Sequence, residues 1–187
     1  MPYNIIEAGQ ARPSRGTRPQ MDTTFAPTPE NGRDLRRAFG RFGTGVTIIT
    51  AHTPDGPLGM TANSFTSVSL DPALVLWSVA ISSKRHNSFA QAPQYAIHIL
   101  AAQQQDLAQR FASDGFAFDG IEWTSGAGGV PILGGALAVF ECAAHAVHPA
   151  GDHSIIVGQV ENVHLSNTDD AGLLFERGQF GTFAPEA

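Results

Sequence analysis

The first stretch of the sequence that could do chemistry reads GMTANSFTS, over residues 59–67, between the aliphatic runs GVTIIT and PALVLWSVA. Thr61, Asn63 and Ser64 supply hydrogen-bond donors and acceptors where a strand would be expected to bury apolar side chains. If the strand continues through the stretch, alternation places polar groups on both of its faces. Two interpretations are open: an edge strand whose hydroxyls face water, or a polar surface that receives the edge of a flat heterocycle.

A second polar cluster, SSKRHNS over residues 82–88, follows the run ALVLWSVA and precedes a predicted helix. It contains Lys84, the only lysine of the chain, beside Arg85. Hydroxyls, two cations and backbone N–H groups at a helix start favour an anion site, with a phosphate as the natural occupant. The alternative is an ordinary helix cap with solvated charges. The chain has no GxxxxGK[ST] sequence, so this is not a P-loop.

A third candidate is His153, which follows Gly151 and Asp152 in PAGDHSIIVGQV at the start of a predicted strand. That position allows the imidazole to project into a cleft, although a structural role is equally open. For five of the remaining histidines a structural role is expected: His52, His98, His145, His148 and His164. No metal site is expected, because the histidines form no HxxxH or HExxH pattern and the single cysteine has no partner.

The chain of 187 residues, 42% of them hydrophobic, is long enough for one domain with a sizeable core. The single cysteine, Cys142, lies in a strand-like run, which predicts a buried thiol and suits a reducing compartment. The N-terminus has no apolar run of signal-peptide length and no segment has the length of a membrane span, so we expect a soluble cytoplasmic protein.

Charge is distributed unevenly, because seven of the eleven lysine and arginine residues lie in the first 41 residues beside four acids. That part carries +3 and the remainder −9, which together give the net charge of −6. A segment this acidic should bind nucleic acids poorly, because affinity for nucleic acids depends on neutralising their phosphates. We therefore expect no nucleic-acid partner and no membrane.

Hydrophobic periodicity predicts many strands and a few short helices. Residues 1–30, rich in proline and without periodicity, are expected to form a mobile arm before a domain over 31–187. Helices are expected at DLRRAFGRF, RHNSFAQA and QQDLAQRFA. Strands are expected at GVTIITAH, LGMTANSFTSVSL, ALVLWSVA and YAIHIL, and in a long hairpin over residues 135–165 that turns at PAGD. The pattern favours an antiparallel barrel over a parallel sheet.

In this order and at these distances, several segments together resemble the short-chain flavin reductase family. They are LRRAFGRFGTGVTIITA, GMTANSFTSVSLDPALVLWSV, SSKRHNSFA, YAIHILAAQQQDLAQRFAS, PAGDHSIIVGQV and LLFERGQFG, covering about residues 34 to 183. The resemblance implies an FMN-binding split barrel, which is a six-stranded antiparallel Greek-key barrel with flanking short helices. It also implies a homodimer with the flavin near the subunit interface.

The same resemblance implies roles for individual residues. The flavin ring would lie against Thr61, Ala62, Asn63 and Ser64, with Phe111 nearby, and the flavin phosphate against Ser82, Ser83, Lys84 and His86. His153 matches a histidine associated with nicotinamide binding, and it would position NAD(P)H without acting as a proton donor. Arg177 and Phe180 fall in a C-terminal motif that often ends in tyrosine in relatives, so Phe180 lacks that hydroxyl.

The activity implied is NAD(P)H:flavin oxidoreduction, in which a hydride passes from NAD(P)H to FMN or FAD and the reduced flavin serves a monooxygenase partner. Three alternatives stay open at this point. The protein could be a non-enzymatic flavin-binding split-barrel module, a reductase that keeps its flavin and acts on another acceptor such as a corrinoid, or a pyridoxamine-phosphate-oxidase-like enzyme. The last would be expected to gather more basic residues around its substrate phosphate than this acidic body offers.

Overall fold

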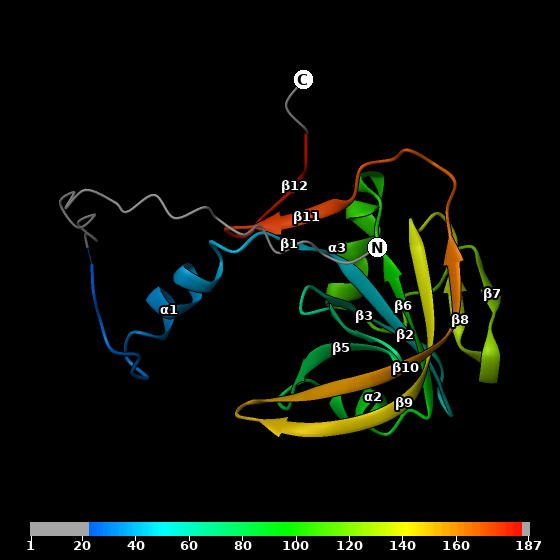
Figure 1. The fold of residues 1–187 in the computed structure, drawn as a ribbon, viewed down its shortest axis with the longest axis horizontal. Coiled ribbons are helices and arrows are strands. Elements are labelled where there is room, and N and C mark those ends of the chain that lie inside the picture. The colour runs from blue at the N-terminus through cyan, green and yellow to red at the C-terminus, as the bar shows by residue number, and fades with distance from the viewer. Residues whose placement is uncertain (1–22, 185–187) are drawn as a thin grey trace.

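A curled antiparallel sheet forms the centre of the computed structural model, which describes residues 23–184 (Figure 1). Its seven strands lie in the order β3-β2-β6-β9-β10-β5-β4. Their bounds are β2 Thr47–Thr53, β3 Gly56–Ala62, β4 Thr66–Leu70, β5 Ala73–Ala80, β6 Gln94–Ile99, β9 Ala138–Ala150 and β10 His153–Leu165. The long hairpin of β9 and β10 turns at Gly151 and Asp152, as the PAGD segment predicted.

The run of six strands from β3 to β5 closes on itself through one side chain. The Ser64 hydroxyl, just after β3, accepts the Ser78 N–H of β5 at 2.9 Å and donates to the Ser78 carbonyl at 3.1 Å. The predicted antiparallel split barrel with flanking short helices is thereby confirmed. The sheet has one strand more than the six predicted, because β4 pairs as a hairpin with the outer edge of β5.

The expectation of one continuous strand over residues 58–70 is wrong. Strand β3 ends at Ala62 and β4 begins at Thr66, so Asn63, Ser64 and Phe65 lie outside any strand and do not alternate. The break has a physical cause, because Ser64 uses its hydroxyl in place of a backbone ladder to bond β5. The small polar residues of GMTANSFTS therefore mark a change of direction at the barrel's seam.

Aromatic side chains fill the barrel. Trp77 of β5 is fully buried and meets the rings of Phe89 and Tyr95 edge to face, with centroids 5.3 and 6.1 Å away. Cys142 of β9 lies in the same core at 1% exposure, which confirms the predicted buried thiol. Burial also raises the pKa of that thiol to about 12, so Cys142 stays protonated and chemically inert near neutral pH.

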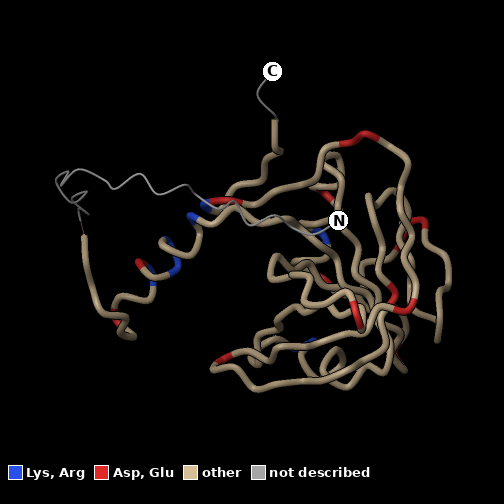
Figure 2. The backbone as a smooth tube through the Cα atoms, in the orientation of Figure 1, with Lys and Arg blue, Asp and Glu red and all other residues tan. Residues whose placement is uncertain are grey.

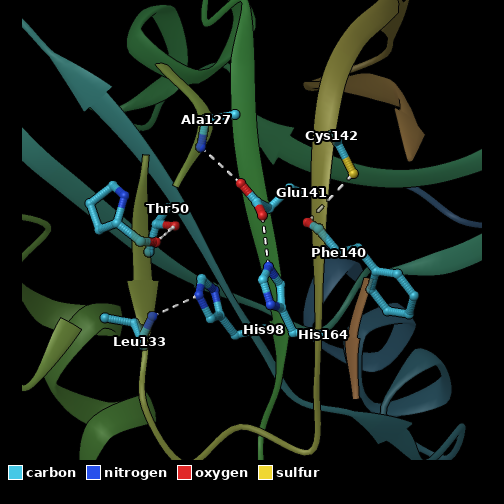
Figure 3. Close-up of polar contacts among 9 residues, drawn as sticks. Thr50, His98, Ala127, Leu133, Phe140, Glu141, Cys142 and His164 are labelled. Atoms are coloured by element: carbon cyan, nitrogen blue, oxygen red, sulfur yellow. Dashed lines mark hydrogen bonds and ion pairs between the residues drawn. The ribbon is translucent and has the colours of Figure 1, made fainter. Parts of the chain in front are cut away.

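Two smaller sheets extend the barrel. One contains β1 Thr44–Gly45, β11 Leu173–Glu176 and β12 Gln179–Thr182, and the other contains β7 Trp123–Ser125 and β8 Pro131–Leu133. Three polar contacts fasten the β7–β8 hairpin to the main sheet (Figure 3). Thr50 donates to the Pro131 carbonyl at 2.6 Å, the Leu133 N–H donates to His98 Nε2 at 3.0 Å, and the Ala127 N–H donates to Glu141 at 2.9 Å.

Three α-helices flank the sheets: α1 Gly32–Phe39, α2 His86–Ala90 and α3 Gln105–Ser113. Two 3₁₀ turns, over Ala102–Gln104 and Ala127–Gly129, complete the elements. All three predicted helices are present: α1 begins and ends earlier than its pattern suggested, α2 is shorter at both ends, and α3 is displaced by one residue. Helix α1 buries no residue and stands to one side of the barrel (Figure 1).

Most of the predicted arm over residues 1–30 lies outside the described residues; its last part, residues 23–30, contains no helix or strand. In the described part of the chain no helix has the length and apolar character that crossing a membrane requires.

Candidate functional site

A groove of about 530 Å³ opens where the end of β3 faces α3 and the β11–β12 hairpin. Thr61, Ala62 and Asn63 form one wall, and Phe180 lies across from them. The groove therefore brings together four of the residues that the sequence analysis assigned to the flavin. Its remaining lining is Val46, Gln109, Ala112, Ser113 and Phe175.

Two hydrogen bonds fix the polar wall of this groove. Thr61 donates its hydroxyl to the Ala108 carbonyl of α3 at 2.6 Å, which holds the helix against the end of β3. The Asn63 amide donates to the Thr44 hydroxyl of β1 at 3.2 Å. With the Thr61 hydroxyl committed to α3 and the Ala62 carbonyl accepting the Thr47 hydroxyl at 2.7 Å, the exposed amide of Asn63 is the side-chain group of this wall left for a ligand.

Two of the predicted ring contacts lie elsewhere. The Ser64 hydroxyl is occupied by both backbone groups of Ser78, so it closes the barrel. Phe111 is fully buried, packs edge to face on Phe118 at 4.9 Å, and covers Gly59 so closely that a Cβ there would collide with its ring. Its side chain is part of the core beneath the groove and does not line it.

The β5–α2 loop, residues 81–85, carries the predicted phosphate ligands. Ser82 and Lys84 are exposed, and the Lys84 ammonium makes no hydrogen bond or ion pair within residues 23–184. Ser83 instead accepts the N–H of Arg85 at 3.2 Å, and both ring nitrogens of His86 are engaged, one by Asn87 and one by Ser154, each at 2.9 Å. The loop thus offers an anion the free Lys84 ammonium, the Ser82 hydroxyl and the O–H of Ser83, which accepts from Arg85 but keeps its own proton to donate.

Arg85 joins this loop to the groove. Its guanidinium donates to the Gly59 carbonyl of β3 at 3.1 Å and to the carbonyls of Phe111 and Ala112 at the end of α3, at 2.6 and 3.0 Å. Burial lowers the pKa of Arg85, and nearby Asp114 opposes that effect. Since Ala112 also lines the groove, Arg85 fixes the phosphate loop beside the groove's wall. Only Lys84 of the cation pair is left for a ligand.

His153 stands at the tip of the β9–β10 hairpin. Its Nδ1 bonds the Asp152 carboxylate at 2.7 Å, and the side chain is 44% exposed. This hydrogen bond is the largest cause of the lowered pKa of Asp152. A carboxylate on Nδ1 favours a proton there, and Nε2 makes no hydrogen bond within residues 23–184.

Arg177 and Phe180 belong to the β11–β12 hairpin. Phe180 packs edge to face on Phe175 at 5.2 Å, and the two rings form the apolar wall of the groove. Arg177 occupies the turn with φ 52°, pairs with Glu176 at 3.1 Å and turns toward α1 rather than the groove. Phe180 therefore lies at the predicted site, and Arg177 lies beside a separate cavity.

Sequence reasoning missed the groove's contribution from α3. Helical phase could have found it, since the 3.6-residue repeat that buries Ala108 and Phe111 turns Gln109, Ala112 and Ser113 to the other side. Phe175 was also missed, although it precedes Arg177 by two residues in LLFERGQFG.

The residues present fit a flavin. Phe175, Phe180 and Val46 offer an apolar surface for a planar ring, Asn63 offers an amide to its polar edge, and Lys84 stands on the loop beside the groove. No cluster of three or more histidine, cysteine or acidic side chains that could hold a metal ion occurs in residues 23–184. The arrangement suits binding and alignment of ring systems more than acid–base chemistry.

Comparison with known proteins agrees with this geometry. The family of the flavin reductase like domain matches residues 39–184. The chain is 52% identical over 160 residues to the FMN reductase (NADH) SmoA of Agrobacterium fabrum, covering 86% of this chain and 91% of that protein. It is 46% identical over 154 residues to the reductase component of a flavin-dependent trigonelline monooxygenase of Acinetobacter baylyi, covering 80% of this chain but only 48% of that protein.

A solved structure is similarly close. The NADH:FAD oxidoreductase SgcE6 of Streptomyces globisporus superposes with a TM-score of 0.80 at 40% identity, covering 90% of this chain and 96% of that one. The same protein has been solved with NAD and FAD fragments. The chain belongs to the flavin reductase like family.

Proposed function

We propose that the protein is an NAD(P)H-dependent flavin reductase that binds FMN or FAD in the groove between β3, α3 and the β11–β12 hairpin. The observation that carries this proposal is the pairing of an aromatic wall, Phe175 and Phe180, with the polar end of β3 and the free cation of the adjoining loop. The relatives support the reaction class, since they are named as NADH-dependent reductases of FMN or FAD.

When bound, the flavin supplies the hydride acceptor. The chain's own contribution is placement. Asn63 addresses the polar edge of the ring, Phe180 and Phe175 flank its apolar surface, and Ser82 and Lys84 hold the phosphate. Holding two ring systems at reacting distance removes much of the entropic barrier to hydride transfer. No side chain needs to gain or lose a proton for this task.

His153 is expected to position the nicotinamide through Nε2, because Nδ1 is engaged by Asp152. His153→Ala should raise the KM for NADH or slow flavin reduction about tenfold, equivalent to about 1.4 kcal/mol. Flavin affinity should stay within twofold of wild type. Stopped-flow reduction across NADH concentrations, beside a flavin titration, measures both quantities. A variant reduced like wild type would make His153 a turn residue, and a variant that lost flavin would move it to the flavin site.

Lys84 is expected to bind the flavin phosphate, because its ammonium is exposed and unpaired among the described residues. Lys84→Ala should weaken flavin binding by about 1 to 3 kcal/mol, the range of a charge-assisted hydrogen bond. Fluorescence quenching of flavin measures the dissociation constant. Riboflavin, which lacks the phosphate, is the matched ligand and should bind both proteins equally. An unchanged constant for FMN would remove Lys84 from the site.

The protein is expected to be a homodimer, because large apolar side chains at the end of α1, just after it, and on β4 have no cover in the described chain. Phe39, Phe42 and Leu70 are 68%, 78% and 88% exposed, and Val68 of β4 is 51% exposed. A second copy that covers these side chains would remove them from water. Light scattering should give twice the chain mass of 19.8 kDa. A stable monomer that still reduces flavin would contradict this expectation.

The reduced flavin is expected to leave for an oxygenase component, as the name of the trigonelline monooxygenase relative suggests for that protein. The groove is open to solvent along one side, so release needs no rearrangement of the barrel.

A further inference from the structure

Positive charge is concentrated at one place on this acidic protein. Residues 23–184 contain eight lysine and arginine residues, and five of them line a single cavity of about 420 Å³ between α1 and the β11–β12 turn. These five are Arg33, Arg36, Arg37, Arg41 and Arg177. Figure 2 shows the basic segments gathered on α1 and where the chain leaves it, and the acidic segments distributed mainly over the barrel.

Helical spacing and the turn after the helix form this cavity together. Arg33, Arg36 and Arg37 lie on α1, and Arg41 follows in the turn after Gly40. The backbone N–H of Arg177 donates to the Gly40 carbonyl at 2.8 Å, which brings the β11–β12 turn against the end of α1. The fifth guanidinium therefore reaches the cavity from a segment more than 130 residues away.

Only two of the five guanidinium groups are neutralised within the described chain. Arg37 pairs with Asp34 at 3.2 Å and Arg177 pairs with Glu176 at 3.1 Å. Arg33, Arg36 and Arg41 have no ion pair or side-chain hydrogen bond within residues 23–184, which leaves an excess of three positive charges around one concave space. Like charges that line one cavity repel one another, and an anion with several oxygens would offset that repulsion.

No other place in residues 23–184 offers such charge to a small anion. Arg85 and Arg110 are used by backbone carbonyls, and Lys84 serves the flavin loop. A reductase of this class must bind two phosphate-bearing molecules, the flavin and the nicotinamide nucleotide. The β5–α2 loop brings one cation, Lys84, with the hydroxyls of Ser82 and Ser83, which suits a single phosphate better than the diphosphate of a second nucleotide.

The arginine cavity also connects with the flavin groove. It shares Arg177 with a shallow depression along β11 and β12, and that depression shares Phe180 with the groove. Through these shared residues the cavity lies next to the wall of the groove that Phe180 forms.

From these observations we infer that the cavity between α1 and the β11–β12 turn is the binding site for the diphosphate of a dinucleotide, with Arg33, Arg36 and Arg41 as its ligands. The inference rests on the proposed reductase function. The nicotinamide donor is the dinucleotide that the charge distribution favours, because the flavin phosphate already has Lys84 of the β5–α2 loop, whereas the donor's diphosphate has no other cluster of cations in residues 23–184. FAD carries the same chemical group, so the experiment separates the two.

ADP-ribose is a direct probe, because it carries the diphosphate without nicotinamide or flavin. Wild-type protein should bind it in calorimetry, and the double variant Arg36→Gln, Arg41→Gln should weaken that binding by roughly 10- to 100-fold, as expected for lost charge-assisted contacts. Arg36→Lys should recover part of the affinity. Arg110→Gln removes one positive charge outside the cavity and should leave ADP-ribose binding unchanged.

Enzyme kinetics shows whether the cavity binds the diphosphate of NADH or that of FAD. The double variant should raise the KM for NADH by a similar factor, whereas the KM for reduced nicotinamide mononucleotide, which has no diphosphate, should change less than threefold. Dissociation constants for FAD and FMN complete the comparison. A loss confined to NADH assigns the cavity to the nicotinamide donor, and a loss confined to FAD assigns it to the flavin; both support a diphosphate site.

The inference is overturned if wild type binds no ADP-ribose and the double variant keeps wild-type constants for NADH and FAD. The arginines would then serve an acidic protein surface. Failure of the proposed function would give a different result, because the wild-type protein would then reduce flavin with neither NADH nor reduced nicotinamide mononucleotide. ADP-ribose binding would still test the cavity in that case.

Discussion

Arg85→Ala should lower the free energy of unfolding by about 3 kcal/mol and weaken flavin binding at least as much as Lys84→Ala, although the Arg85 side chain is not expected to touch the flavin. The reason is its three hydrogen bonds to the carbonyls of Gly59, Phe111 and Ala112. Without the guanidinium, two partly buried carbonyls lose their charged donor, and the phosphate loop loses its attachment to β3 and α3. Urea unfolding and FMN titration measure the two effects.

Two further variants test whether the effect is specific to the Arg85 guanidinium. Arg110→Ala removes a guanidinium that bonds one exposed carbonyl, that of Asp119, and should cost less than about 1 kcal/mol. Arg85→Lys keeps the charge, but an ammonium lacks the planar guanidinium that donates to three carbonyls at once. It should therefore recover only part of the stability and of the flavin affinity. An Arg85→Ala protein with wild-type stability and wild-type flavin affinity would remove Arg85 as the link between loop and groove.

Stability should fall as the pH is lowered from about 6.5 to about 4, because of one buried histidine. His98 is fully buried and neutral: its Nδ1–H donates to the Ile48 carbonyl at 3.0 Å, and its Nε2 accepts the Leu133 N–H at 3.0 Å. Burial, as the largest cause, lowers the pKa of His98 to about 4, and the charge of His164 adds to the effect while the Ile48 carbonyl and the Glu141 carboxylate oppose it.

The sign follows from proton binding. The unfolded chain protonates His98 below its ordinary pKa of 6.5, whereas the folded chain resists protonation until about pH 4. The loss across that window should approach about 3 kcal/mol, at 1.36 kcal/mol for each pH unit. Glu141 acts in the same direction, because the Ala127 N–H and then His164 lower its pKa, so it too resists protonation in the folded state.

Urea unfolding at a series of pH values measures this loss. His98→Gln should lower stability at neutral pH, since it disturbs the attachment of β8 to the sheet, but it should also flatten the pH dependence between 6.5 and 4. His145→Gln, on the exposed side of β9, should keep the wild-type slope. Equal slopes in the wild-type and His98→Gln proteins would show that His98 is not the group responsible.

Most strands of the barrel could be predicted from the sequence, because strand patterns and turn residues are local features of the chain. The β9–β10 hairpin and helices α2 and α3 lie where their periodicity predicted them. The break at Asn63 to Phe65 was not predictable from that stretch alone. It depends on the hydrogen bond between Ser64, which follows β3, and Ser78 of β5, although β3 and β5 are not neighbours in the sheet.

The site was predictable in part for the same reason. Thr61, Asn63 and Phe180 lie in the groove, and Lys84 is free beside it, as their motifs suggested. The sequence could not separate Lys84 from Arg85, because only the fold brings three carbonyls to Arg85. Nor could it show Phe111 in the core or Arg177 beside α1, since both outcomes depend on which side of an element meets another part of the chain.

The measurement that tests the central claim most directly is anaerobic stopped-flow of flavin absorbance after mixing the protein and FMN with NADH. A flavin reductase with its binding groove at β3, α3 and the β11–β12 hairpin should bleach the flavin at a rate that is proportional to protein and saturates with NADH. The same trace with FAD tests the second flavin. Bleaching no faster than in a mixture without protein, for both flavins and for both NADH and NADPH, would contradict the account.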